Sequence, residues 1–147
     1  MAMVGILVTN GYAPAKGVDP EQLYCVAKAV YSEARGEPIM GQVAVAWGVR
    51  NRTRSKDFPD EACAVIYDRK HAVQFPNIDQ VVIDYNSEEW DSAVEVAGHV
   101  TAGLVADPTM GSRFWYNPQK VAKPSWAKFA YSLRIGDHVF YEIKKPS

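Results

Sequence analysis

The stretch Val43-Ala44-Val45-Ala46-Trp47-Gly48-Val49 decides how the rest of this chain can fold. It lies inside a helix predicted from about Ile39 to Arg52, and it is apolar on almost every side. A surface helix carries a single apolar stripe, so a helix that is apolar all round is surrounded by other elements. Its small residues also let neighbouring backbones come close. We therefore expect the rest of the chain to pack around residues 39–52.

An amphipathic helix is predicted immediately before this stretch. Asp19 suits the N-cap, Pro20 the first helical position, and Gln22 the place where a capping box needs a side-chain amide. Gly36 and Pro38 end the helix. One face is predicted to be buried, because apolar residues repeat there at helical spacing: Leu23, Val26, Ala27, Val30 and Tyr31.

The remaining elements change from helical to extended along the chain. Capping residues and apolar spacing predict two further helices, at 59–67 and 86–105. Extended apolar residues predict a strand at 113–116, and turn residues between two such runs predict a β-hairpin at 131–142. The hairpin turns at Gly136-Asp137. Residues 1–18 are expected to form an irregular lead-in, and residues 19–147 a single domain. The expected fold class is α+β, mostly helical with a small C-terminal antiparallel β-sheet.

The composition is that of a folded domain without an excess of charge. The chain has 147 residues, 48% of them hydrophobic, and a formal net charge of -1. Because binding to a phosphate backbone needs a basic surplus, a nucleic-acid partner is not expected. Basic residues gather at 50–56 and 120–128, either as solvated helix ends and loops or as contacts for an anionic polymer.

The sequence shows neither a membrane segment nor a secretion signal. No run approaches the roughly 18 apolar residues of a membrane-spanning helix. Residues 1–8 lack the basic start of a signal peptide. The chain is therefore expected to stay out of the membrane and to be cytoplasmic when made.

Two cysteines, Cys25 and Cys63, are too few for a disulfide framework. The sequence favours two buried thiols. A single bridge between them stays an alternative if the protein works in an oxidising compartment.

Glu33 stands out because of its position on the amphipathic helix. It follows Val30 by three residues and Val26 by seven, which puts its carboxylate on or beside the apolar face in the last turn. Lost solvation and the negative end of the helix dipole both raise its pKa, toward about 6–7, as a general acid requires. The alternative is an ion pair with an arginine such as Arg35 or Arg52. The spacing alone leaves both roles open.

Other catalytic chemistries lack their sequence patterns. The three histidines, His71, His99 and His138, have no metal-ligand spacing, and neither cysteine supplies one. The chain contains no G-x-S-x-G nucleophile motif and no Gly-rich phosphate loop. We therefore expect neither a metal nor another cofactor.

Several short motifs follow one another in the order found in a known family. They are Tyr31-Ser32-Glu33-Ala34-Arg35-Gly36-Glu37-Pro38, Gly41-Gln42-Val43-Ala44-Val45-Ala46, Asn51-Arg52, Phe58-Pro59, Val65-Ile66-Tyr67, Gln74-Phe75, Asp107-Pro108-Thr109, Tyr116-Asn117-Pro118 and Ile135-Gly136-Asp137-His138-Val139-Phe140-Tyr141. In this ordered set the chain resembles the SleB/CwlJ-type cell wall hydrolases, which include spore-cortex-lytic enzymes and phage endolysins. The resemblance implies a lysozyme-like fold and cleavage of the bond between N-acetylmuramic acid and N-acetylglucosamine. It also implies that Glu33 is the catalytic residue.

The resemblance favours a lytic transglycosylase, which cleaves peptidoglycan glycan strands with one glutamate and leaves 1,6-anhydromuramic ends. A hydrolytic N-acetylmuramidase is the nearest alternative, and a non-catalytic wall-binding module is a more distant one. Residues 19–147 are then a single catalytic domain. Without a visible export signal, the chain is expected to be a phage endolysin, a monomer that waits in the host cytoplasm. It would reach the cell wall after a holin has permeabilised the membrane.

Six further residues are the best candidates for contacts with the glycan: Tyr116, Asn117, Asn51, Thr53, Gln74 and Phe75. Tyr116 and Phe75 are alternatively core residues, and Asn51 and Thr53 alternatively cap the end of the 39–52 helix. Glu37 is expected to have a structural role, as a cap or a charge near the start of that helix.

Overall fold

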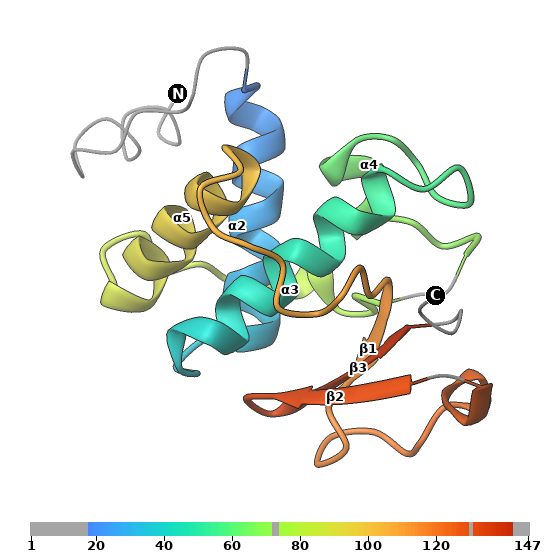
Figure 1. Ribbon diagram of the computed structural model, residues 1–147. Helices are drawn as coiled ribbons and strands as arrows, with labels where there is room; N and C mark the ends of the chain where they lie inside the picture. The colour runs from blue at the N-terminus through green and yellow to red at the C-terminus, as the bar shows by residue number, and fades with distance from the viewer. Residues whose placement is uncertain (1–17, 72–73, 130, 143–147) are drawn as a thin grey trace.

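The computed structural model describes residues 18–71, 74–129 and 131–142 (Figure 1). The predicted lead-in, residues 1–18, therefore lies outside the described residues apart from Val18. Within them the elements are α2 (Pro20–Ala34), α3 (Ile39–Thr53), α4 (Ala62–Ile66), η1 (Ile78–Gln80), α5 (Glu88–Thr101), β1 (Phe114–Tyr116), η2 (Ser125–Phe129), β2 (Tyr131–Ile135) and β3 (His138–Glu142). The predicted fold class, mostly helical with a small C-terminal antiparallel sheet, is confirmed. None of the described helices is long and apolar enough to span a membrane.

Helix α3 occupies the middle of the molecule. Every residue from Gly41 to Val49 is buried, as the sequence predicted. In Figure 1 the helix crosses between the pair α2 and α5 on one side and the three-stranded sheet on the other. It contacts α2, α4, α5 and the hairpin strand β2. Burial of its apolar surface from all sides is therefore central to the stability of the fold.

Helices α2 and α5 both begin with a side-chain cap, that of α2 at the predicted residue Asp19 and that of α5 at Ser87, within the predicted range 86–105. The carboxylate of Asp19 accepts the amide of Glu21 at 2.9 Å. The hydroxyl of Ser87 accepts the amide of Trp90 at 3.1 Å. Each cap satisfies an amide that has no partner within its helix, which explains why these starts could be predicted from local sequence.

The side chain of Gln22 does not complete the capping box predicted for α2. Its amide donates to the carboxylate of Glu61 at 3.1 Å, and its carbonyl accepts the backbone amide of Cys63 at 3.0 Å. Both partners lie at the start of α4. Gln22 therefore fastens α4 to α2, because tertiary partners replace the local one.

Cys25 and Cys63 form a disulfide bridge, so the prediction of two buried thiols is wrong. Their Cα atoms lie 5.1 Å apart although 38 positions separate them in the chain. The contacts of Gln22 bring the start of α4 to this part of α2. Two cysteines far apart in sequence carry no signal of such proximity.

Helix α5 ends at Thr101, before the end predicted near Val105. Gly103 has a φ of +74°, in the left-handed region that favours glycine. The amide of Leu104 donates back to the carbonyl of His99 at 2.9 Å and closes the helix end. The apolar spacing continues past this point, so spacing alone overestimated the length of the helix.

The three strands form an antiparallel sheet in the order β1-β3-β2. Strands β2 and β3 are the predicted hairpin, with Ile135 paired to His138 beside the turn. Strand β1 pairs with the other edge of β3 and puts Trp115 opposite Phe140. These two rings stack with centroids 5.8 Å apart, and the Trp115 ring lies directly against Gly48 of α3. The Trp115 ring is thus a central contact between the sheet and helix α3.

Gly48 is a point of very close approach between α3 and the sheet. An added Cβ there would lie 2.5 Å from the Trp115 ring, nearer than two carbon atoms can approach. Gly48→Ala is therefore expected to lower the free energy of unfolding by about 1–3 kcal/mol, as overpacking does, although alanine is the better helix former. Urea unfolding followed by circular dichroism measures this change.

A second substitution tests the cause of that loss. Trp115→Phe removes the ring atoms that the new methyl group would meet. The double variant Gly48→Ala/Trp115→Phe should therefore lose less stability than the two single losses added together. Strictly additive losses would show that the destabilisation has another origin.

Candidate active site

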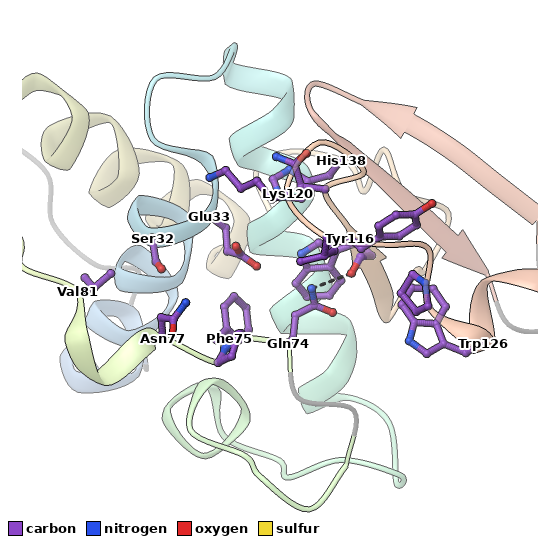
Figure 2. A pocket seen from close by; sticks show the side chains of 15 residues that line it. Ser32, Glu33, Gln74, Phe75, Asn77, Val81, Tyr116, Lys120, Trp126 and His138 are labelled. Atoms are coloured by element: carbon purple, nitrogen blue, oxygen red, sulfur yellow. Dashed lines mark hydrogen bonds between the residues drawn. The ribbon is translucent and has the colours of Figure 1, made fainter.

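A cavity of about 570 Å³ opens between the end of α2, the segment that contains η1, and the sheet (Figure 2). This volume lies within the roughly 300–1,000 Å³ of small-molecule sites. Aromatic and polar side chains line it together: Ser32, Glu33, Gln74, Phe75, Pro76, Asn77, Val81, Trp115, Tyr116, Asn117, Lys120, Val121, Pro124, Trp126 and His138. The cavity therefore joins residues from both halves of the chain around Glu33.

Glu33 reaches this cavity from the last turn of α2. Its side chain is half-buried, and burial raises the pKa of its carboxyl from 4.5 to about 7. A hydrogen bond with Gln74 and the charge of Lys120 lower this pKa by less, and the charge of Glu37 raises it slightly. The carboxyl therefore keeps its proton up to about neutral pH, as its helical position predicted.

The two arginines considered as ion-pair partners of Glu33 interact elsewhere. The guanidinium of Arg35 lies over the ring of Tyr31, 4.4 Å from its centroid. That of Arg52 is fully buried and donates from Nε to the carbonyl of Arg113 at 2.7 Å. The geometry therefore favours Glu33 as a proton donor over Glu33 as a salt-bridge partner.

Gln74 connects Glu33 to Arg52 and to the sheet. Its side-chain carbonyl accepts from Nη2 of Arg52 at 3.2 Å, and its amide donates to the carbonyl of Trp115 at 2.7 Å. The same side chain also interacts with Glu33 and lowers the pKa of its carboxyl. Burial lowers the pKa of Arg52 to about 10, so the guanidinium stays charged at neutral pH. Gln74, one of the predicted glycan contacts, thus lines the cavity and lies beside the carboxyl of Glu33.

Tyr116, Asn117 and Phe75 line the cavity as well. The half-buried Tyr116 stacks on Tyr141, with centroids 6.0 Å apart. Phe75 is 3% exposed and packs edge-on against Trp115. Tyr116 and Asn117 therefore bring polar atoms to the cavity, whereas Phe75 mainly builds its floor. Contact of these three residues with a glycan stays a prediction.

Asn51 and Thr53 are not among the described residues that line the cavity. The amide of Asn51 donates to the carboxylate of Asp107 at 2.9 Å and to the carbonyl of Ser112 at 3.1 Å. The hydroxyl of Thr53 donates to the carbonyl of Arg50 at 2.6 Å. Neither side chain is brought to Glu33, because α3 presents Asn51 to the 107–112 segment and Thr53 to its own last turn. Asn51 thus anchors the segment that leads into β1.

Glu37 makes structural contacts near the start of α3, but it is not the helix cap that was one of its two predicted roles. Its Oε1 accepts the amide of Asp137 at 3.0 Å, and its Oε2 lies 3.3 Å from Nδ1 of His138. Pro38 is the N-cap of α3 and makes no side-chain cap. Glu37 therefore ties the start of α3 to the hairpin turn, 100 positions away, which local capping rules cannot foresee.

Among the described cavity residues outside the predicted site, two are charged or titratable: Lys120, which belongs to the basic run that could contact an anionic polymer, and His138, which was not predicted as a site residue. Lys120 follows β1, and its charge acts on both Glu33 and His138. Figure 2 shows the three side chains at the same end of the cavity. Lys120 belongs to a basic run and His138 follows the hairpin turn, so each was visible in the sequence. That both lie near Glu33 could not be seen in the sequence, because it depends on how the sheet packs against α3.

Comparison with known proteins identifies the family. A family model described as Cell Wall Hydrolase matches residues 36–141, a range that begins just after Glu33. Spore cortex-lytic enzymes from Halalkalibacterium halodurans and Bacillus cereus are 34% and 31% identical to the chain over 127 and 137 residues, which are 84% and 92% of it. The chain spans less than half the length of these relatives, 36% and 48% respectively.

Two solved structures have the same fold. The catalytic domain of the germination-specific lytic transglycosylase SleB from Bacillus anthracis aligns with a TM-score of 0.69 and 29% identity, over 86% of this chain and 98% of that domain. The catalytic domain of the Bacillus cereus SleB protein aligns with a TM-score of 0.65 and 29% identity, over 91% of this chain and 97% of that domain. The chain therefore belongs to the cell wall hydrolase family and has the fold of the SleB catalytic domain.

Proposed function

We propose that this chain is a peptidoglycan lytic transglycosylase and that Glu33 is its catalytic acid. The observation that carries the proposal is a half-buried carboxyl group that faces the cavity and keeps its proton to about neutral pH. Of the described residues that line the cavity, Glu33 is the sole carboxylic acid. A solitary acid suits a transglycosylase, whereas glycoside hydrolysis commonly uses two carboxyl groups roughly 5–9.5 Å apart.

The relatives support this substrate class and this reaction. The family is that of cell wall hydrolases, and one structural relative is the catalytic domain of a germination-specific lytic transglycosylase. The chain covers nearly all of that domain, so a complete catalytic unit is aligned. Peptidoglycan glycan strands are accordingly the proposed substrate.

In the proposed reaction, Glu33 gives its proton to the glycosidic oxygen between N-acetylmuramic acid and N-acetylglucosamine as the bond from C1 to that oxygen breaks. The C6 hydroxyl of the muramic acid closes on C1 and gives up its proton. In the simplest scheme the carboxylate of Glu33 takes that proton. The product is a 1,6-anhydromuramic end, and no water is consumed.

The surrounding side chains suit the charges that develop. Lys120 lowers the pKa of Glu33, and so it stabilises the carboxylate that remains after proton transfer. The rings of Tyr116 and Trp126 meet edge to face at 6.1 Å and offer aromatic surfaces to sugar rings. Gln74 is bound to the sheet and interacts with the carboxyl of Glu33 from that side. A site arranged in advance needs little reorganisation during the reaction.

A hydrolytic N-acetylmuramidase is the alternative reaction on the same bond. It commonly needs a second carboxylate that activates water or attacks the sugar. Glu37, the second carboxylate of the motif, binds the hairpin turn and is absent from the described lining of the cavity. The transglycosylase therefore has the better support.

Digestion of purified sacculi tests the reaction. The muramic ends are expected as 1,6-anhydro forms, lighter by one water than reducing ends, because O6 and not water attacks C1. Mass spectrometry of the released fragments measures this difference. Digestion in heavy-oxygen water is the control, since only a hydrolase carries the label into its products. Reducing, labelled muramic ends would establish the muramidase instead.

The place where the protein acts in biology is a separate question from the reaction that it catalyses. The relatives described above are spore cortex-lytic enzymes, which supports action at the cell wall or the spore cortex. They lend no support to a phage endolysin, to release by a holin, to a monomer or to synthesis in a host cytoplasm. These four statements stay predictions.

A further inference from the structure

His138 and Glu37 form a buried pair at the edge of the cavity, and the reaction described so far does not use it. The two side chains are 2% and 6% exposed, and Nδ1 of His138 lies 3.3 Å from Oε2 of Glu37. His138 lines the same cavity as Glu33, at the end where Lys120 also lies (Figure 2). An imidazole and a carboxylate are costly to bury, so their pairing at this edge calls for an explanation.

Several contacts fix the position of Glu37. Its Oε1 accepts the amide of Asp137 at 3.0 Å, and its backbone carbonyl accepts the side-chain amide of Gln42 at 3.0 Å. Gly41 and Gly136 flank Oε1 so closely that a Cβ at either position would collide with it. The carboxylate is therefore held between the start of α3 and the hairpin turn.

The fixed carboxylate orients the imidazole. The two nitrogens lie on different edges of the ring, and Nδ1 of His138 faces Glu37. Because His138 lines the cavity and its Nδ1 is turned to Glu37, we infer that Nε2 is the nitrogen left for a molecule in the cavity. The 3.3 Å contact is an ion-pair contact and not a hydrogen bond. A carboxylate beside Nδ1 still favours the tautomer with its hydrogen on Nδ1, which leaves Nε2 as an acceptor. This is the arrangement that orients a general base.

Burial keeps the ring of His138 neutral near pH 7. Burial lowers its pKa most, and Lys120 adds to this effect. Glu37 and Asp137 raise the pKa by less, so it lies below its usual 6.5. The pKa of Glu33 in the same cavity is about 7. Around neutral pH the cavity therefore contains a protonated acid and an unprotonated base, a pairing typical of acid–base catalysis.

We propose that His138, oriented by Glu37, is the base that accepts the proton of the C6 hydroxyl during cleavage. The proposal rests on the transglycosylase function proposed above and replaces the second half of the role of Glu33. The glycosidic oxygen takes the proton of Glu33 as its bond to C1 breaks, O6 bonds to C1, and the O6 proton passes to Nε2. Exchange with solvent then returns a proton to Glu33 and removes one from His138.

The pH dependence of the variant His138→Gln tests this role. Wild-type kcat/KM should fall above about pH 7, where Glu33 loses its proton, and also at acid pH, where His138 gains one. His138→Gln should lower kcat by about 10²-fold, at the lower end of general-base effects. In the plot of kcat/KM against pH, the variant should also lose the fall at acid pH (the acid limb) and keep the fall above about pH 7 (the alkaline limb). An acid limb that persists unchanged in a folded His138→Gln protein would overturn the proposal.

Glu37→Gln separates a base from a residue that merely packs. Glutamine has a single side-chain oxygen, so it can accept from the amide of Asp137 or from Nδ1 of His138 but not from both, as the two carboxylate oxygens do. The negative charge that raises the pKa of His138 is also gone. The acid limb should therefore move to lower pH. A loss of rate without any movement of the limb would assign the pair a purely structural role and overturn the proposal.

Two controls complete the experiment. His71→Gln removes a histidine that is 42% exposed and is absent from the described lining of the cavity, so both limbs should stay. Thermal melting of each variant reports whether it folds. The products of His138→Gln are analysed by mass as well: anhydro ends with an unchanged acid limb reject the base but keep the transglycosylase, whereas reducing ends from the wild type reject the transglycosylase itself.

Discussion

Replacing Glu33 by Gln is expected to slow the clearing of purified sacculi by about a thousandfold or more, because general acid catalysis alone contributes about 10²–10⁴ in rate. Glutamine keeps the size and hydrogen-bonding capacity of the side chain but has no proton to give at this pH. The loss of turbidity of a sacculus suspension measures the rate. The matched control is Glu21→Gln, which changes an exposed carboxylate in the first turn of the same helix and should clear at the wild-type rate.

Binding to sacculi distinguishes the outcomes of that experiment. A Glu33→Gln protein that still sediments with sacculi but no longer clears them is a folded, inactive enzyme. Clearing at the wild-type rate would mean that Glu33 is not the acid or that lysis is not enzymatic, as for a non-catalytic wall-binding module. Loss of binding together with activity would point to misfolding.

Glu33 should also reveal itself in the stability of the protein. Its carboxyl has a pKa of about 7 when folded and 4.5 as a free group, so the folded state holds the proton more tightly. The protonated carboxyl therefore makes its full contribution to the free energy of unfolding below about pH 4.5, and this contribution is lost as the pH rises to about 7. Above pH 7, Glu33→Gln should therefore be more stable than the wild type, by at most about 3 kcal/mol. Urea unfolding at pH 4 and pH 8 measures this.

Removing the disulfide should have the largest effect on stability. The bridge between Cys25 and Cys63 closes a loop of 38 positions between α2 and α4. A loop of this length corresponds to about 4 kcal/mol of stabilisation from the lost entropy of the unfolded chain. This is a large share of the roughly 5–15 kcal/mol that stabilises a typical domain. The double variant Cys25→Ala/Cys63→Ala should lose about this amount in urea unfolding.

Reduction of the wild-type protein provides the comparison for that variant. A thiol reductant should destabilise the wild type to a similar extent and leave the double variant unchanged. Activity at low temperature should survive in both, because neither cysteine is among the described residues that line the cavity. A wild type that is indifferent to the reductant would contradict a stabilising bridge.

The secondary structure could largely be predicted from the sequence. Asp19 and Ser87 cap their helices through neighbours two or three residues away, and the Gly136-Asp137 turn forms between adjacent strands. Such signals act over one turn of helix or one hairpin, so they do not depend on how the rest of the chain packs. The end of α5 was missed because Gly103 outweighs the apolar spacing that continues beyond it.

The candidate site could be predicted only in part. Tyr116, Asn117 and Gln74 reach the cavity, but Asn51 and Thr53 turn to other partners. All five residues follow or sit in elements whose existence was correctly foreseen. Their side-chain directions, however, depend on packing between elements, which no short-range pattern describes.

By itself the sequence determined the buried helix α3, the hairpin, and the position of Glu33 beside an apolar helix face. Helical periodicity and turn chemistry depend only on residues a few positions apart. The tertiary structure alone decided what Glu33 meets: Gln74, Lys120, and the pair of Glu37 and His138. These contacts join positions as far as 100 residues apart, so they exist only once α3 has brought the end of α2 and the hairpin together.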